Sequence, residues 1–118
     1  MRKISISADR SYEVLLDIDY LTTLESAAIG RERVAIIHSE AMTGRITQLR
    51  DTEAQVFFFP IPDGEAGKSA DTLLKVWDWL GAAGFTRSDL IVGIGGGAVT
   101  DFAGFAAATW LRGLDWIA

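Results

Sequence analysis

The stretch Leu90-Ile91-Val92-Gly93-Ile94-Gly95-Gly96-Gly97-Ala98-Val99-Thr100-Asp101 decides the fold class of this chain. Its first five residues form a short apolar run, which predicts a strand buried on both faces of a parallel sheet. Residues 98–110 then carry the small and apolar side chains of a helix that lies close to a sheet. A glycine-rich turn between a strand and a helix can bring backbone N–H groups and the positive end of the helix dipole to a phosphate. The segment therefore predicts a diphosphate-binding turn.

The same glycines formally match a dinucleotide fingerprint. Gly93, Gly95 and Ala98 fit the G-x-G-x-x-G/A pattern, and Asp115 lies near the distance of the ribose-binding acid. In the standard unit, however, the glycine turn is the first strand-to-helix connection, whereas here two such units precede it and Asp115 begins its strand. We therefore do not assign the fingerprint, and a tight turn that only allows close helix packing remains the alternative.

Apolar runs and helical spacing alternate along the rest of the chain. The expected strands are residues 4–6, 12–18, 34–37, 55–61 and 114–118, and the expected helices are residues 41–49 and 69–83. The first two strands would form a small antiparallel or edge pair. The alternation predicts an α/β fold, a Rossmann-like parallel sheet with flanking helices.

The composition limits the classes of function. The chain has 118 residues, 49% of them hydrophobic, a net charge of −5, no Cys and one His. The acidic balance argues against nucleic-acid binding, and the missing ligands exclude a self-contained four-ligand zinc site. No stretch approaches the roughly eighteen apolar residues of a membrane span. We expect a cytoplasmic protein with no membrane contact.

A second segment with chemical potential follows the predicted strand 55–61. It contains Asp63, Gly64, Glu65 and Lys68. A carboxylate can accept both hydroxyls of a ribose, and a lysine can hold a phosphate or hydroxyl. Alone, the segment also fits a solvated turn with an acidic helix start. Because the carboxyl ends of parallel strands meet at one edge, the two segments together favour a nucleotide site.

Three groups of residues together resemble the N-terminal, NAD-binding part of the 3-dehydroquinate synthases. They are Pro62-Asp63-Gly64-Glu65 with Lys68, Gly95-Gly96-Gly97 with Asp101, and the run Ala103–Gly113. The resemblance covers the whole chain in order and spacing and is weakest before Arg33. It implies the N-terminal domain of the dehydroquinate synthase-like fold, with residues 1–118 as an incomplete NAD-binding domain.

The resemblance also implies an activity. Members of this family are phosphorus–oxygen lyases of the shikimate pathway, which leads to chorismate and the aromatic amino acids. They cyclise a seven-carbon keto-acid phosphate to 3-dehydroquinate, eliminate phosphate and use NAD transiently. A helical domain absent from this chain binds their divalent metal, zinc or cobalt. We therefore expect an N-terminal portion that is inactive alone and holds no catalytic or metal-binding residue.

The resemblance assigns cofactor roles by position. Glu65 and Lys68 would hold the adenosine ribose, Gly96 and Gly97 the diphosphate, and Asp101 the nicotinamide end of NAD. These five positions are the centre of the expected cofactor site.

Four further positions have more distant roles. Asp63 and Gly64 belong to the same cofactor turn. Ser39 stands where many family members carry Asp or Asn, and it can still offer one hydroxyl to the adenosine. Arg112 matches an arginine that helps to hold the substrate phosphate from the neighbouring subunit, which implies a homodimer. Without the resemblance, Arg112 is a helix-end cation that satisfies carbonyls.

Other functions remain open at this point. A related sugar phosphate cyclase or a metal-dependent polyol dehydrogenase would share the architecture. A nucleotide-binding or interaction module without chemistry is the alternative outside the enzymes. We expect His38, a lone imidazole at a strand end, to be a loop or interface residue and not a catalytic base.

Overall fold

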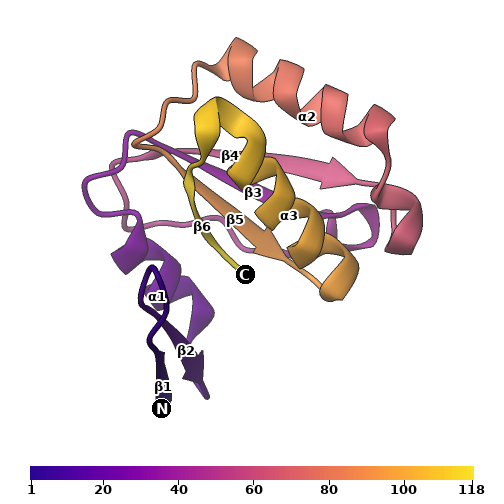
Figure 1. Cartoon of the computed structure of the whole chain (residues 1–118). Helices are drawn as coiled ribbons and strands as arrows, with labels where there is room; N and C mark the ends of the chain where they lie inside the picture. The colour runs from indigo at the N-terminus through magenta and orange to yellow at the C-terminus, as the bar shows by residue number, and fades with distance from the viewer.

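Six strands and three α-helices make up the chain in the computed structural model, which describes residues 1–118 (Figure 1). The strands are β1 (Arg2–Ile6), β2 (Tyr12–Leu16), β3 (Arg33–Ser39), β4 (Gln55–Ile61), β5 (Leu90–Ile94) and β6 (Asp115–Ile117). The α-helices are α1 (Tyr20–Ala27), α2 (Ala70–Ala83) and α3 (Gly97–Thr109), and the 3₁₀ turns are η1 (Glu40–Met42), η2 (Gly64–Gly67) and η3 (Trp110–Arg112). None of the helices has the length and hydropathy that a membrane crossing requires.

The central sheet is parallel throughout, which confirms the predicted fold class. Its strand order is β4-β3-β5-β6. After β4 the chain crosses over β3 to reach β5, so the direction of winding reverses between β3 and β5. Ligands of such sheets bind outside the carboxyl ends of the strands at this reversal. Pro60 lies in β4, an edge strand, where a missing backbone donor is tolerated.

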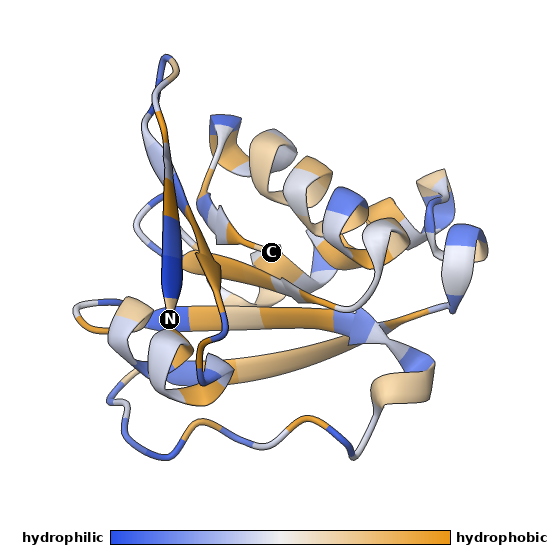
Figure 2. Cartoon of the chain, turned by 90° about the horizontal axis from the view of Figure 1, so that it is seen from below, coloured by the Kyte–Doolittle hydropathy of each residue, from blue (hydrophilic) through white to orange (hydrophobic).

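The two faces of the sheet bury different helices (Figures 1 and 2). Alternate residues of β3 point to opposite faces, because side chains alternate along a strand. Ala35 and Ile37 pack with α2 and α3, whereas Val34 and Ile36 pack with α1. Figure 2 shows the central strands as apolar bands between the helical layers. The result is a three-layer domain whose sheet is covered on both sides.

Local signals explain the two longer helices. The Ser69 hydroxyl caps α2 by accepting from the Thr72 backbone N–H at 3.1 Å, and Gly84 ends the helix in the left-handed region at φ 80°. Helix α3 lies very close to β5, since a Cβ added to Gly93 would sit 2.7 Å from the Cβ of Ala103. The small residues expected between strand and helix therefore serve this close approach.

The expected helix at residues 41–49 is wrong. Only the short turn η1 forms there, and Gly44 turns the backbone to φ 79°, off the helical path. The segment continues without regular structure, and Ile46 and Leu49 pack on the α1 face of the sheet. Helix α1 was not predicted from the sequence. Its local signal is Asp19, whose carboxylate accepts from the Thr22 backbone N–H at 3.2 Å.

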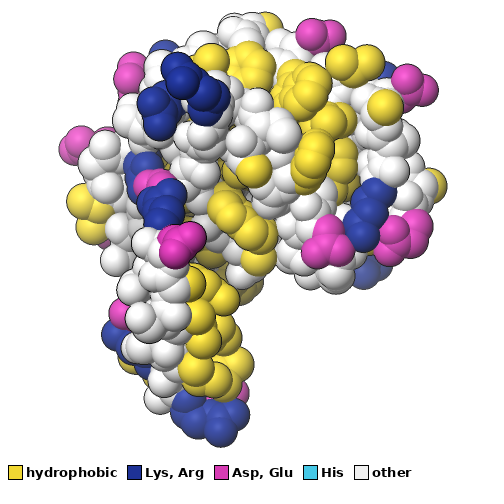
Figure 3. Space-filling model, in the orientation of Figure 1, with side chains coloured by type: hydrophobic (Ala, Val, Ile, Leu, Met, Phe, Trp, Pro, Cys, Tyr) yellow, Lys and Arg dark blue, Asp and Glu magenta, His cyan; other side chains and the backbone are white.

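Strands β1 and β2 form an antiparallel hairpin, as predicted, that is separate from the main sheet and stands away from it (Figure 2). One face of the hairpin carries the ion pair of Lys3 with Glu13, at 3.2 Å. The opposite face is apolar, with Ile4 paired to Val14 and both exposed. Figure 3 shows this apolar strip along the projecting part of the molecule.

Candidate functional site

A cluster of charges joins two turns at the carboxyl edge of the sheet. The Lys68 amine donates to Asp101 Oδ2 at 2.9 Å and lies 3.3 Å from Glu65 Oε2. Lys68 and Glu65 come from the turn after β4, and Asp101 lies on the second turn of α3. The hydrogen bonds to Asp101 and then Glu65 raise the pKa of Lys68, so the amine stays protonated. Figure 3 shows basic and acidic side chains gathered where η2 faces the start of α3.

The glycine turn after β5 leaves its backbone open. Gly95 adopts φ 151°, and Gly96 caps α3 from an extended conformation. A Cβ added to Gly96 or Gly97 would meet nothing within 4 Å, so this stretch of backbone faces free space. The first N–H groups of a helix have no partner within it and carry the positive end of the dipole. The turn can therefore accept an anionic group.

The turns after β3 and β4 lie side by side. Ser39 ends β3 opposite Ile61 of β4, and its side chain is half-buried and does not cap η1. Asp63 is exposed, and its Oδ1 accepts from the Ala41 backbone N–H at 2.9 Å. Gly64 takes a left-handed conformation at φ 62°. The structure thus brings Glu65, Lys68 and Asp101 into direct contact and directs Asp63 to a backbone partner.

A cavity of about 360 Å³ adjoins the charge cluster. Lys68 and Asp101 line it together with Leu73 of α2 and with Phe102 and Phe105 of α3. Charged groups on one side and apolar walls on the other suit a ligand with both polar and apolar parts.

Arg112 lies away from this cluster. It follows α3, whose opposite end begins at the glycine turn, and thirteen helical residues span about 20 Å. Leu111 and Arg112 both adopt left-handed backbone, at φ 46° and 65°, and both side chains are exposed. Within one chain, the structure does not bring Arg112 together with the predicted cofactor residues.

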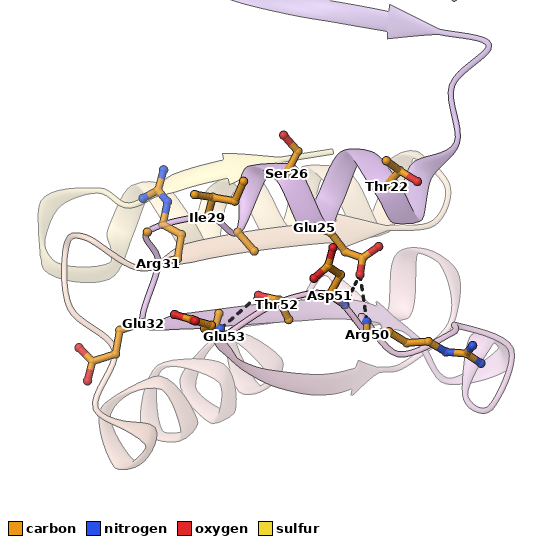
Figure 4. A pocket seen from close by; sticks show the side chains of 13 residues that line it. Thr22, Glu25, Ser26, Ile29, Arg31, Glu32, Arg50, Asp51, Thr52 and Glu53 are labelled. Atoms are coloured by element: carbon orange, nitrogen blue, oxygen red, sulfur yellow. Dashed lines mark hydrogen bonds between the residues drawn. The ribbon is translucent and has the colours of Figure 1, made fainter.

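A second cavity, of about 820 Å³, lies at the opposite, amino edge of the sheet (Figure 4). Its lining residues 30–32 and 50–54 directly precede β3 and β4. Glu25 of α1 points across it and accepts from the backbone N–H groups of Arg50 and Asp51. Four carboxylates line this cavity against two guanidinium groups, so it does not suit a phosphate ligand.

Asp115, the acid of the formal fingerprint, also lies at the amino edge. It begins β6 opposite Leu90, the first residue of β5. Arg31 and Arg10 donate to its two oxygens at 2.8 and 3.0 Å and lower the pKa of this carboxyl. Asp115 therefore ties β6 to the chain before β3 and to the hairpin, and it is not available to a ligand at the carboxyl edge.

Sequence reasoning missed two features of the carboxyl edge. Thr100 Oγ1 donates to the carbonyl oxygens of Gly97 at 3.2 Å and Gly96 at 3.3 Å, within the glycine turn. The Ala41 backbone N–H donates a hydrogen bond to Asp63, and no local sequence pattern predicts this contact. The structure also places His38 inside β3, 3% exposed, where Nδ1 lies 2.9 Å from the Ser39 carbonyl oxygen, and not in a loop.

No group of three or more His, Cys, Asp or Glu side chains is placed to hold a metal ion. A parallel sheet with a reversal of winding, a glycine turn and charged turns at its carboxyl edge defines a Rossmann-like α/β domain.

The particular family follows from comparison with known proteins. Residues 58–118 match the family model described as 3-dehydroquinate synthase N-terminal, and the chain belongs to this family. The chain is 48% identical over 113 residues to the 3-dehydroquinate synthase of Streptomyces coelicolor, covering 91% of this chain and 31% of that protein. It is 49% identical over 87 residues to the 3-dehydroquinate synthase of Thermobifida fusca, covering 70% of this chain and 24% of that protein. The chain thus spans a third or less of these curated relatives.

Solved structures support the fold. Two crystal structures of 2-deoxy-scyllo-inosose synthase superpose with TM-scores of 0.81 and 0.82 at 23% sequence identity. Each superposition covers 98% of this chain, and this chain spans 35% and 34% of the two synthase chains. One of them is complexed with carbaglucose-6-phosphate, NAD⁺ and Co²⁺.

Proposed function

We propose that residues 1–118 form the NAD-binding region of a cytoplasmic 3-dehydroquinate synthase of the shikimate pathway. The reaction closes a seven-carbon keto-acid phosphate into 3-dehydroquinate and eliminates phosphate. The observation that carries this proposal is the 48% identity to the Streptomyces coelicolor enzyme across 91% of the chain. The charge cluster and the open glycine turn at one sheet edge support the same conclusion.

In this proposal the chain binds and orients NAD, which supplies a temporary hydride acceptor for a ring hydroxyl. The backbone N–H groups at Gly96 and Gly97 hold the diphosphate, because their surroundings are open and at a positive helix end. Glu65 accepts from ribose hydroxyls, and Lys68 donates beside it. Asp101 then lies towards the nicotinamide end.

The Ser39 hydroxyl and the turn at Asp63 and Gly64 complete the adenosine side of this proposed site. Ser39 ends the strand β3, directly beside the reversal of winding between β3 and β5.

Arg112 acts, we propose, on the substrate phosphate of a neighbouring subunit in a homodimer. Its exposed position about one helix length from the glycine turn supports a role outside its own site. The chain offers no metal cluster, so the divalent metal and its helical domain would come from residues outside these 118.

The test is the activity of the native polypeptide that contains this chain. We expect phosphate release and 3-dehydroquinate formation from the keto-acid phosphate, lost when NAD is removed and when Glu65 is replaced by Ala. The isolated 118-residue chain should bind NAD without turnover, because it lacks the metal ligands. Failure of the native polypeptide to form 3-dehydroquinate would contradict the proposal.

A second candidate function is a related sugar phosphate cyclase, which the similarity to 2-deoxy-scyllo-inosose synthase favours. The two are separated by assaying a hexose 6-phosphate against the seven-carbon substrate. A metal-dependent polyol dehydrogenase would instead accumulate NADH, and a binding module without chemistry would turn over neither substrate.

A further inference from the structure

The side chain of Asp63 makes a hydrogen bond that its position before a helical turn does not predict. Asp63 stands directly before η2, where an aspartate commonly caps the first turn, yet its side chain makes no bond to that turn. Its Oδ1 instead accepts from the backbone N–H of Ala41, at 2.9 Å. Ala41 lies in η1, the turn that follows the neighbouring strand β3, 22 residues earlier in the chain. The carboxylate therefore joins the turns that follow two adjacent strands.

The surrounding backbone fixes this bond in place. Strands β3 and β4 run parallel to their ends, with Ser39 opposite Ile61. The turn after β4 folds back tightly, because a Cβ added to Gly67 would lie 2.5 Å from the Pro62 carbonyl oxygen. Asp63 therefore reaches η1 from a turn that has little freedom to move.

A second polar link continues from the same turn. The amine of Lys68, which follows η2, donates to Asp101 of α3 at 2.9 Å. The carboxyl ends of β3, β4 and β5 are thus connected in series, first by Asp63 to Ala41 and then by Lys68 to Asp101.

We propose that Asp63 is a positioning residue, which holds the turn after Ser39 in register with the turn that carries Glu65 and Lys68. It acts through the Ala41 N–H and not through contact with a dinucleotide. This inference rests on the proposed function, because the two turns that it joins flank the proposed adenosine side. Asp63 is exposed, so loss of this one bond loosens η1 without unfolding the domain.

The test compares Asp63→Ala with Asp63→Asn in the native polypeptide. The amide oxygen of Asn can still accept from Ala41, so we expect NAD affinity within about twofold of the unsubstituted protein. Asp63→Ala should weaken NAD binding about tenfold, measured by calorimetry, since one hydrogen bond is lost. Hydrogen exchange at the Ala41 amide should quicken in Asp63→Ala and stay slow in Asp63→Asn.

Glu65→Gln is the matched control from the same turn. It should weaken NAD binding and leave exchange at Ala41 unchanged, because its carboxylate does not contact η1. Equal losses of affinity in Asp63→Ala and Asp63→Asn, with unchanged exchange at Ala41, would overturn the positioning role. If the unsubstituted protein binds no NAD, the proposed function fails and the cofactor role of Asp63 fails with it. Even then, the exchange of Ala41 in Asp63→Ala reports whether the bond exists.

Discussion

The two edges of the parallel sheet use their charged side chains differently. At the amino edge, Asp89 is 0% exposed and accepts from the backbone N–H groups of Arg33 at 3.1 Å and Thr86 at 2.7 Å. At the carboxyl edge, the side chains of Glu65 and Asp101 are 77% and 69% exposed and share a single amine. The buried carboxylate of Asp89 at the amino edge therefore serves the fold, whereas the exposed carboxylates of Glu65 and Asp101 at the carboxyl edge can release Lys68 to a ligand.

The largest expected effect is on stability and comes from the amino edge. Asp89→Ala should lower the free energy of unfolding by about 3 kcal/mol, because it leaves the backbone N–H groups of Arg33 and Thr86 without an acceptor. It also removes one of the two carboxylates that pair with the Arg33 guanidinium. Urea unfolding measures the change. Asp89→Asn, which keeps one acceptor, should lose about half as much. Equal stability of Asp89→Ala and the unsubstituted protein would contradict the structural role of this carboxylate.

The matching change at the carboxyl edge should affect binding and not stability. Lys68→Met should weaken NAD binding about 30-fold, because it removes a charged donor from the proposed site. The free energy of unfolding should change by less than about 0.5 kcal/mol, since the ion pairs are exposed. Lys75→Met, on the exposed surface of α2, is the control and should change neither quantity. A large loss of stability in Lys68→Met would place Lys68 with the structural charges.

Substitutions at two glycines separate stability from ligand binding without changing any charge. Gly93→Ala should destabilise the domain by about 1.5 kcal/mol, because its Cβ would press on Ala103. Gly97→Ala adds a Cβ that would lie in free space, so the stability of this variant should be unchanged. The added methyl group should hinder the binding of a phosphate at the glycine turn. Thermal unfolding and NAD titration of both variants separate the two effects. The prediction fails if both variants lose stability alike.

The smallest expected effect is the pH dependence of the Asp115 ion pairs. Arg31 and then Arg10 lower the pKa of Asp115, so the folded state binds its proton less readily than the unfolded state does. The contribution to stability is therefore present above the ordinary pKa of 3.8 and is lost as the pH falls through the lowered value. Because the side chain is 41% exposed, Asp115→Asn should cost under about 1 kcal/mol at neutral pH. Unfolding curves of both proteins should converge in acid, and a difference that persists there would contradict this assignment.

Local patterns were sufficient for most of the main sheet. Buried apolar runs identified β3 and β5, and helical spacing predicted α2 to within one residue at its start. The sequence could not show that Gly44 interrupts the expected helix at residues 41–49, because glycine is tolerated within helices at a modest cost. The hydrophobic pattern of residues 41–49 likewise did not indicate that the chain between β3 and β4 would pack in an irregular conformation.

The candidate site was predicted in part. Spacing indicated that Glu65, Lys68 and the glycine turn would share one edge of the sheet, because parallel strands end together. The bond between Lys68 and Asp101 spans 33 residues, and the bond between Asp63 and Ala41 spans 22. Contacts of this range depend on strand order, which no local pattern encodes.

The central claim is that the carboxyl edge is the ligand-binding edge, and an NMR titration of the 118-residue chain with NAD tests it most directly. We predict saturable shifts of the Gly96 and Gly97 amides and of residues 64–68, with the amides of Arg33, Asp89 and Asp115 unmoved. Shifts confined to the amino edge, or no saturable shift at the glycine turn, would contradict the account.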